Sequence, residues 1–300
     1  MEILEITVDS ESEGMRIDRY LKRKFKGEPL SRIFQALRKG DVKVNGKKVK
    51  ENYRLELDDK VIFRHLKQEF SLEKQKRDKI YINAEILKKY KKMVIFENED
   101  FFIVNKSGNV PMHKGNKHSF GLSEAFKEIY KSESINFANR LDYETSGLVI
   151  GCKNLKFLRY ISEKIRNNEV LKKYVAAVHG KITESEFTLE DYLITTETGV
   201  RISKDGKEKG AKKSIAHFSL VERKKTFLKK EKISENTSVL NINLITGRKH
   251  QIRVQLSNAG YPILGDRKYG IGDNIEKLYL SCYFLSFDDF KFEIGNSDLD

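Results

Sequence analysis

Residues 137–151 read F-A-N-R-L-D-Y-E-T-S-G-L-V-I-G, and the rest of the chain is organised around this stretch. The apolar run 148–150 lies between two glycines and predicts a buried strand. Asp142 precedes this run and follows Arg140 by two positions. Loops at strand ends are where rigid scaffolds present reactive groups, so Asp142 is a candidate reactive carboxylate. On spacing alone, a solvated ion pair or a turn residue is the more common explanation.

Charge and composition indicate a soluble globular protein with a polyanionic partner. The 300 residues are 39% hydrophobic, and 58 Lys and Arg against 44 acids give a formal charge of +14. Such an excess favours nucleic acid first and an anionic membrane surface second. A generally lysine-rich composition, with many lysines facing only water, is the alternative explanation.

No motif in the chain predicts a metal site, a disulfide or a targeting segment. Cys152 and Cys282 are far apart and have apolar neighbours, so we expect buried packing residues. No Cys/His cluster has zinc spacing, and no apolar run reaches the length of a membrane helix. The first residues, M-E-I-L-E-I-T-V, lack the pattern of a signal peptide. We therefore expect a cytoplasmic protein without a resident metal.

The N-terminal part predicts a small, basic α+β unit. Residues 3–8 alternate as a strand, and apolar residues at helical spacing follow from Arg16. Ser31 is the expected N-cap of a second helix that ends at Gly40, and Asn45-Gly46 predicts a tight hairpin before a strand at 61–63. Residues 22–50 hold eleven Lys or Arg and two acids, a density that suits a phosphate backbone.

Residues 64–79 are charged and lack a regular apolar pattern, so we interpret them as a linker and place a domain boundary near residue 75. Beyond it we expect helices at 84–92, 122–130 and 154–168, and strands at 94–96, 101–104, 170–180 and 278–285. Residues 199–213 predict a flexible basic loop, and residues 224–234 a polar hairpin tip. A strand ends at 246–247, and a helix begins near Lys249.

The segment N-R-L-D-Y-E-T-S-G-L resembles the catalytic motif of RluA-type pseudouridine synthases, H-R-L-D-x-x-T-S-G-L, with Asn139 in place of His. Three further blocks resemble the same family in the same order. They are V-I-F-E-N-E-D-F-F-I-V-N-K-S-G at 94–108, V-L-K-K-Y-V-A-A-V-H-G at 170–180 and L-I-T-G-R-K-H-Q-I-R-V-Q-L at 244–256. Residues 14–64 resemble the S4 RNA-binding module.

The resemblance implies roles for individual residues. Asp142 would be the catalytic carboxylate, Tyr174 would stack on uracil, and Arg253 would form an ion pair with Asp142. Arg140 would fill the space left by a flipped base. Further contacts to RNA are implied for Thr145, Arg248, His250, Gln251 and Leu280 in the second domain, and for Arg16, Arg32, Lys39 and Lys47 in the first.

The fold class expected is therefore α+β. A small S4-like α+β domain with its charged linker occupies residues 1–75, with a core at about 14–64. A mixed α/β catalytic domain with a mostly antiparallel sheet occupies residues 76–300. The implied function is isomerisation of uridine to pseudouridine in RNA, most often large-subunit ribosomal RNA, by a monomer that needs no cofactor. The alternatives are a synthase acting on tRNA and a non-catalytic RNA-binding or ribosome-assembly protein. A hydrolase is a more distant alternative, because glycoside hydrolysis usually needs a second acid.

Overall fold

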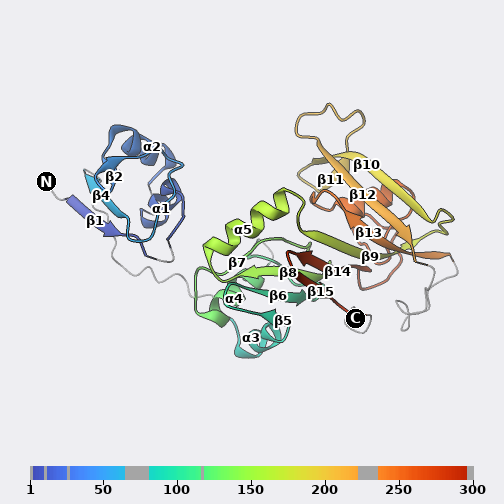
Figure 1. Ribbon diagram of the computed structural model, residues 1–300. Coiled ribbons are helices and arrows are strands. Elements are labelled where there is room, and N and C mark those ends of the chain that lie inside the picture. Colours follow the sequence, from blue (N-terminus) through green and yellow to red (C-terminus); the bar gives the residue numbers. More distant parts are fainter. Residues whose placement is uncertain are drawn as a thin grey trace.

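The computed structural model describes residues 3–9, 12–25, 28–64, 81–115, 118–221 and 236–295. One hydrophobic core lies within residues 8–63 and a larger one within residues 82–294. Figure 1 shows the helices and strands of both parts. The expected linker and domain boundary fall on residues 65–80, and the expected hairpin tip falls within residues 222–235. Both therefore lie outside the described residues.

The N-terminal domain packs two helices against a four-stranded antiparallel sheet with strand order β1-β4-β2-β3. Its elements are β1 (Ile3–Thr7), α1 (Ile17–Lys24), α2 (Leu30–Lys39), β2 (Val42–Val44), β3 (Lys47–Lys48) and β4 (Lys60–Arg64). The apolar stripes of both helices are buried, while the lysines and arginines between them stay on the surface. The expected helix, helix, hairpin and strand are confirmed here.

Local sequence signals set the turns of this domain, with one exception. Gly40 ends α2 at a φ of 81°, and Asn45 and Gly46 have φ values of 49° and 74° between β2 and β3. Two positive φ angles in a two-residue hairpin suit Asn-Gly, because glycine has no Cβ and asparagine tolerates the left-handed region. The expected cap at Ser31 is wrong, because α2 begins at Leu30 after Pro29, which has no side-chain hydrogen bond to offer.

The second domain is built on an eleven-stranded sheet whose main path runs β11-β10-β12-β13-β9-β14-β8-β6-β5. All its paired strands are antiparallel except β8 and β14. The strands are β5 (Val94–Glu97), β6 (Phe101–Lys106), β7 (Asn136–Phe137), β8 (Ser146–Cys152), β9 (Leu171–His179), β10 (Glu186–Thr195), β11 (Val200–Ile202), β12 (Lys212–Leu220), β13 (Thr237–Leu244), β14 (Leu280–Phe287) and β15 (Phe290–Glu293).

Four helices lie against this sheet: α3 (Ala84–Lys91), α4 (Leu122–Tyr130), α5 (Leu155–Arg166) and α6 (Gln251–Asn258). Helix α5 packs on β7 and β8, and α6 packs on β10 and β11 (Figure 1). The Asn154 side chain accepts a hydrogen bond of 2.8 Å from Phe157 N, which confirms it as the cap of α5. Among the described residues, no helix combines the length and the apolar character that crossing a bilayer requires.

Two expectations for this domain need correction, and one is confirmed. Residues 199–213 are not one loop, because residues 200–202 pair with β10 as strand β11 and β12 begins at Lys212. Helix α6 begins at Gln251 rather than near Lys249, since His250 takes a left-handed φ of 53° just before it. Cys152 and Cys282 are buried and unpaired, as expected.

A buried lysine at the end of β6 fixes the loops beside the sheet. The Lys106 side chain is fully buried, and its Nζ donates to the carbonyls of Ser107, Val110 and Tyr143 at 3.0, 3.0 and 3.1 Å. Burial lowers the pKa of Lys106 to about 7, against an opposing effect of Asp142. The three carbonyls match the three donors of an ammonium group. Lys106 therefore ties the 107–110 loop to the chain immediately after Asp142.

We expect Lys106→Met to lower the free energy of unfolding by about 2–4 kcal/mol, because it leaves three inward-facing carbonyls without a donor. Lys89 is exposed on α3, so Lys89→Met is a matched control that should change stability by less than about 0.5 kcal/mol. Chemical denaturation of both variants measures the difference. Equal stabilities would show that the three hydrogen bonds do not hold the loop.

Candidate functional site

A cavity of about 670 Å³ opens where the N-terminal ends of β8 and β14 meet the start of α6. Asp142 is the single acidic residue among the residues that line it. Six lining residues are lysine or arginine: Arg140, Arg166, Lys172, Arg248, Lys249 and Arg253. The cavity is therefore strongly electropositive around one carboxylate, an arrangement that attracts polyanions.

The sheet register brings three expected site residues to this cavity. Because β8 and β14 are parallel, with Ser281 opposite Ser146, both strands begin at the same edge. Thr145 and Leu280 lie at these beginnings, are buried and line the cavity. On the other side of β14, Tyr174 of β9 pairs with Cys282 and also lines it. The Thr145 hydroxyl has no hydrogen-bond partner among the described residues.

Tyr174 is a buried phenol, with 7% of its surface exposed. Burial raises its pKa well above 10, and the neighbouring Cys282 and Asp142 act in the same direction. The side chain therefore remains a neutral phenol at physiological pH. Tyr174 and Asp142 line the same cavity.

The loop that carries Asp142 is attached to the sheet at two points. The Asn139 amide accepts from Ile150 N at 2.8 Å and donates to Leu148 O at 3.4 Å, so it pairs with β8 before Asp142. Lys106 holds the carbonyl of Tyr143 after it. Between these attachments the Asp142 side chain is 20% exposed and faces the cavity.

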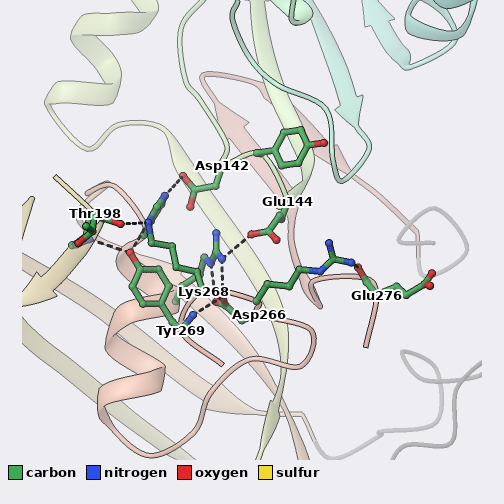
Figure 2. Close-up of polar contacts among 12 residues, drawn as sticks. Asp142, Glu144, Thr198, Asp266, Lys268, Tyr269 and Glu276 are labelled. Atoms are coloured by element: carbon green, nitrogen blue, oxygen red, sulfur yellow. Dashed lines mark hydrogen bonds and ion pairs between the residues drawn. The ribbon is translucent and has the colours of Figure 1, made fainter. Parts of the chain in front are cut away.

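The expected direct ion pair between Asp142 and Arg253 is wrong. Arg253 Nε and Nη2 donate to the two carboxylate oxygens of Asp266, each at 2.7 Å, and Nη2 also donates to Glu144 Oε2 at 2.8 Å. Figure 2 shows Glu144 and Asp266 reaching the same guanidinium group. These two carboxylates engage Nε and Nη2 of Arg253, and among the described residues Asp142 acts on Arg253 through its charge without an ion-pair contact.

This buried pair is electrostatically tight. The side chains of Arg253 and Asp266 are 3% and 1% exposed. Burial opposes the charge on both, but their mutual hydrogen bonds outweigh it, so the pKa of Arg253 is raised and that of Asp266 is lowered. Asp266 also accepts from the backbone N–H groups of Lys268 and Tyr269, both at 2.9 Å.

Among the described residues, His250 is the ionisable side chain that approaches the Asp142 carboxylate within 4 Å. Its Nε2 lies 3.8 Å from Asp142 Oδ1, and its Nδ1 lies 2.7 Å from the Tyr269 hydroxyl (Figure 2). Burial lowers the pKa of His250 against the opposing effect of Asp142, and Arg253 lowers it further. The ring is therefore predominantly neutral at physiological pH.

Gln251 and Arg248 both line the cavity, but they differ in how many of their polar atoms are already hydrogen-bonded to the protein. The Gln251 carbonyl accepts from Thr246 Oγ1 at 2.9 Å and from Arg248 N at 3.0 Å, and its amide donates to Ile215 O at 3.1 Å. Gln251 therefore stabilises the start of α6 and has little capacity left for a ligand. Arg248 is exposed, and within the described ranges its side chain is engaged only through Nε, which donates to Lys213 O at 3.1 Å.

The expected RNA-contacting residues of the N-terminal domain lie on its surface. Lys39 and Lys47 are exposed, with no hydrogen bond or ion pair of their side chains among the described residues. Arg32 pairs with Glu28 at 3.2 Å, and Arg16 forms a two-point pair with Asp18 at 3.1 and 2.7 Å. The two lysines are thus the more available cations.

Four residues that shape this site were given no role by the sequence analysis. Asp266 and Tyr269 both fall in the stretch G-D-R-K-Y-G, whose polar residues follow a buried segment. Lys106 interrupts the apolar strand F-F-I-V-N-K, and Lys172 stands two positions before Tyr174. A charged residue in an apolar strand was the available signal for Lys106. No group of His, Cys, Asp and Glu within the described ranges has the arrangement of a metal site.

We expect Asp266→Asn to lower the free energy of unfolding by about 3–5 kcal/mol, because it leaves the Arg253 charge buried with one partner fewer. The lowered pKa of Asp266 means that its contribution is complete above its ordinary pKa of 3.8 and is lost as the pH falls below that value. The variant should therefore lose stability less steeply on acidification. Urea denaturation at several pH values measures this.

Glu276→Gln, at an exposed residue, is the control and should behave like the wild type. If the free energies of unfolding of Asp266→Asn and the wild type changed in parallel with pH, the assignment would be contradicted.

Comparison with known proteins identifies both parts of the chain. The family model described as RNA pseudouridylate synthase matches residues 100–258, and the S4 domain model matches residues 15–61. The ribosomal large subunit pseudouridine synthase C of Buchnera aphidicola subsp. Baizongia pistaciae is 32% identical over 297 residues, which cover 94% of this chain and 88% of the relative. The protein of the same name from Escherichia coli is 28% identical over 299 residues, with the same two coverages.

Solved structures share the fold of the second domain. The human RNA pseudouridylate synthase domain containing 1 superposes with a TM-score of 0.54 at 23% identity over 67% of this chain and 81% of that protein. The human RNA pseudouridylate synthase domain containing 4 superposes with a TM-score of 0.57 at 17% identity, over 70% of this chain and 91% of that protein. Since the synthase model alone matches just over half of the residues, this chain belongs to the RluA family of RNA pseudouridine synthases, which are isomerases, and carries an N-terminal S4 domain.

Proposed function

We propose that this enzyme converts uridine to pseudouridine in large-subunit ribosomal RNA, with Asp142 as the catalytic carboxylate. The observation that carries this proposal is the single acidic residue in a cavity lined by six lysines and arginines. The cations suit the phosphates around a target nucleotide, and the carboxylate is the group that can act on its ribose. The named relatives support ribosomal RNA as the substrate.

The reaction is an isomerisation in which nothing is added or removed. The N1–C1′ bond of uridine breaks, the uracil rotates, C5 bonds to C1′, and the C5 proton is exchanged for one on N1. Asp142 either adds to C1′ and is later displaced by C5, or takes the C2′ proton and returns it through a glycal. In both routes the carboxylate is regenerated, so no cofactor is consumed.

The ion pair of the second acid, Glu144, argues against a glycoside hydrolase. Hydrolysis of a glycosidic bond usually uses two carboxyl groups that face the scissile bond. Glu144, the acid nearest to Asp142 in sequence, is paired with Arg253 at 2.8 Å and is not among the cavity residues. A single free carboxylate suits an internal transfer, in which the departing base itself returns as the nucleophile.

The neighbours of Asp142 suit an extruded nucleoside. A uridine within folded RNA must leave its stack to reach a buried carboxylate. The neutral phenol of Tyr174 offers a face on which uracil can stack, and Thr145 offers a hydroxyl without a protein partner. Arg140 is exposed at the cavity, where its planar guanidinium can stack in the space that the base leaves.

We expect Asp142→Asn to abolish pseudouridine formation, a loss of about 10²–10⁴-fold or more, because the amide neither attacks C1′ nor accepts the C2′ proton. RNA affinity should be unchanged or slightly higher, since a negative charge is removed near phosphates. Base-resolved pseudouridine sequencing and filter binding measure the two quantities. The control Glu99→Gln, at an exposed acid, should keep both.

The same assay separates the candidate functions. Modification of large-subunit ribosomal RNA but not of a tRNA pool supports the proposed substrate, and the reverse result selects the tRNA alternative. RNA binding without any pseudouridine in either pool would leave an RNA-binding or ribosome-assembly protein as the better description. Undiminished turnover by Asp142→Asn would end the assignment of that residue.

The S4 domain should contribute affinity rather than chemistry. We expect Lys39→Gln combined with Lys47→Gln to raise KM and leave kcat unchanged, because both residues are exposed and lie outside the cavity. Each lost phosphate contact should also reduce the slope of log affinity against log salt by about one. Lys89→Gln on α3 is the matched control. A fall in kcat with an unchanged KM would contradict this division.

A further inference from the structure

We propose that Tyr269 is a positioning residue that fixes the tautomer of His250, so that the ring presents an Nε2–H group to the catalytic carboxylate. This inference rests on the proposed role of Asp142 and adds two residues to it. It follows from the hydrogen bonds around a single phenolic oxygen.

The Tyr269 hydroxyl already accepts one hydrogen bond from the backbone. Val200 N, at the start of β11, donates to it at 3.1 Å. The hydroxyl must place its own proton elsewhere, and within the described part of the chain the acceptor in hydrogen-bond distance is His250 Nδ1, at 2.7 Å. Burial raises the pKa of Tyr269, so this proton is present at neutral pH. An N–H on Nδ1 would meet this donor proton, so Nδ1 is the unprotonated nitrogen.

The proton of a neutral His250 ring is then on Nε2, which faces Asp142 Oδ1 at 3.8 Å. In this tautomer an N–H points at a carboxylate, whereas the other tautomer would set a lone pair against it. Cations near the ring disfavour a second proton on it, among them Arg253, Lys268 and Lys249. At 3.8 Å the contact is longer than a hydrogen bond, so the neutral ring stabilises the Asp142 carboxylate electrostatically and leaves its charge available.

Tyr269 is itself held on several sides, as a positioning residue requires. Its backbone N–H donates to Asp266 at 2.9 Å, and its carbonyl accepts from Ser257 Oγ at 2.6 Å. The next residue back, Lys268, donates from Nζ to Thr198 O at 2.6 Å, which brings the turn before β11 against the phenol (Figure 2). His250 is held in a left-handed conformation before α6. These contacts fix the backbone from which each ring projects.

The test reads the tautomer directly. In protein labelled with ¹⁵N-histidine, two-bond proton–nitrogen correlation distinguishes the nitrogen that carries the proton, and His250→Gln identifies the signals of His250 among the six histidines. We expect the wild type to carry the proton on Nε2. In Tyr269→Phe this preference should be lost, and kcat should fall by about tenfold, the equivalent of one hydrogen bond of about 1.4 kcal/mol, with KM nearly unchanged.

Tyr261→Phe is the matched control, because that hydroxyl makes no hydrogen bond among the described residues, and it should alter neither quantity. A proton on Nδ1 in the wild type, or an unaltered tautomer in Tyr269→Phe, would overturn the proposal, as would an altered tautomer with an unaltered kcat. The spectrum is read without RNA, so an enzyme that fails to form pseudouridine still reports its tautomer.

A second pair of variants covers the case in which Tyr269→Phe does not fold. The amide nitrogen of Gln lies near the position of Nε2, and that of Asn near Nδ1. His250→Gln should therefore retain more activity than His250→Asn. Equal kcat values for the two variants would count against a donor at Nε2.

Discussion

The arrangement of this active site depends on one buried ion pair, between Arg253 of α6 and Asp266 of the segment that leads to β14. Both side chains are almost completely enclosed, so removing either would leave an uncompensated charge in a medium of low polarity. The same guanidinium binds Glu144, and the same carboxylate binds the backbone at Tyr269. Three segments are therefore joined at a single point: the start of α6, the turn that carries Tyr269 and, 109 positions from Arg253, the loop before β8. Asp142 belongs to that loop, so its position depends on this junction.

Arg253 also gives different surroundings to Asp142 and Glu144, two acids that are only two positions apart in the sequence. Glu144 is held by Arg253 and withdrawn from the cavity, whereas Asp142 remains the one acid among its lining residues. The consequence is a division of roles: one carboxylate neutralises a structural cation, and the other stays available in an electropositive cavity. Lys106 and Asn139 complete the restraint by attaching the backbone on either side of Asp142. The chemical environment of Asp142 is thus set by groups that are themselves engaged in the protein.

Much of the fold follows from local signals, and the site follows from them only in part. Asn45-Gly46 and Asn154 determine a turn and a cap through their own side chains and backbone preferences, so a short window suffices to predict them. The motif around Asp142 placed that residue in the loop before a buried strand for the same reason. The partner of Arg253 could not be read in this way, because Glu144 is 109 positions away and the competition between three acids for one guanidinium is decided by tertiary packing. Strand β11 was missed because its three residues are stabilised by pairing with β10 rather than by their own pattern.

The amide of Asn139 gives the loop before β8 an attachment that does not titrate. Its oxygen accepts from Ile150 and its nitrogen donates to Leu148, and an amide keeps both functions across the whole physiological range of acidity. An imidazole, the side chain usual at this position in the family, offers one acceptor and one donor only while it is neutral, and it loses the acceptor when it gains a proton. In this enzyme the attachment through Asn139 is therefore independent of proton concentration near neutrality. The other attachment of the same loop, through Lys106, titrates in that range, because burial lowers the pKa of Lys106 to about 7.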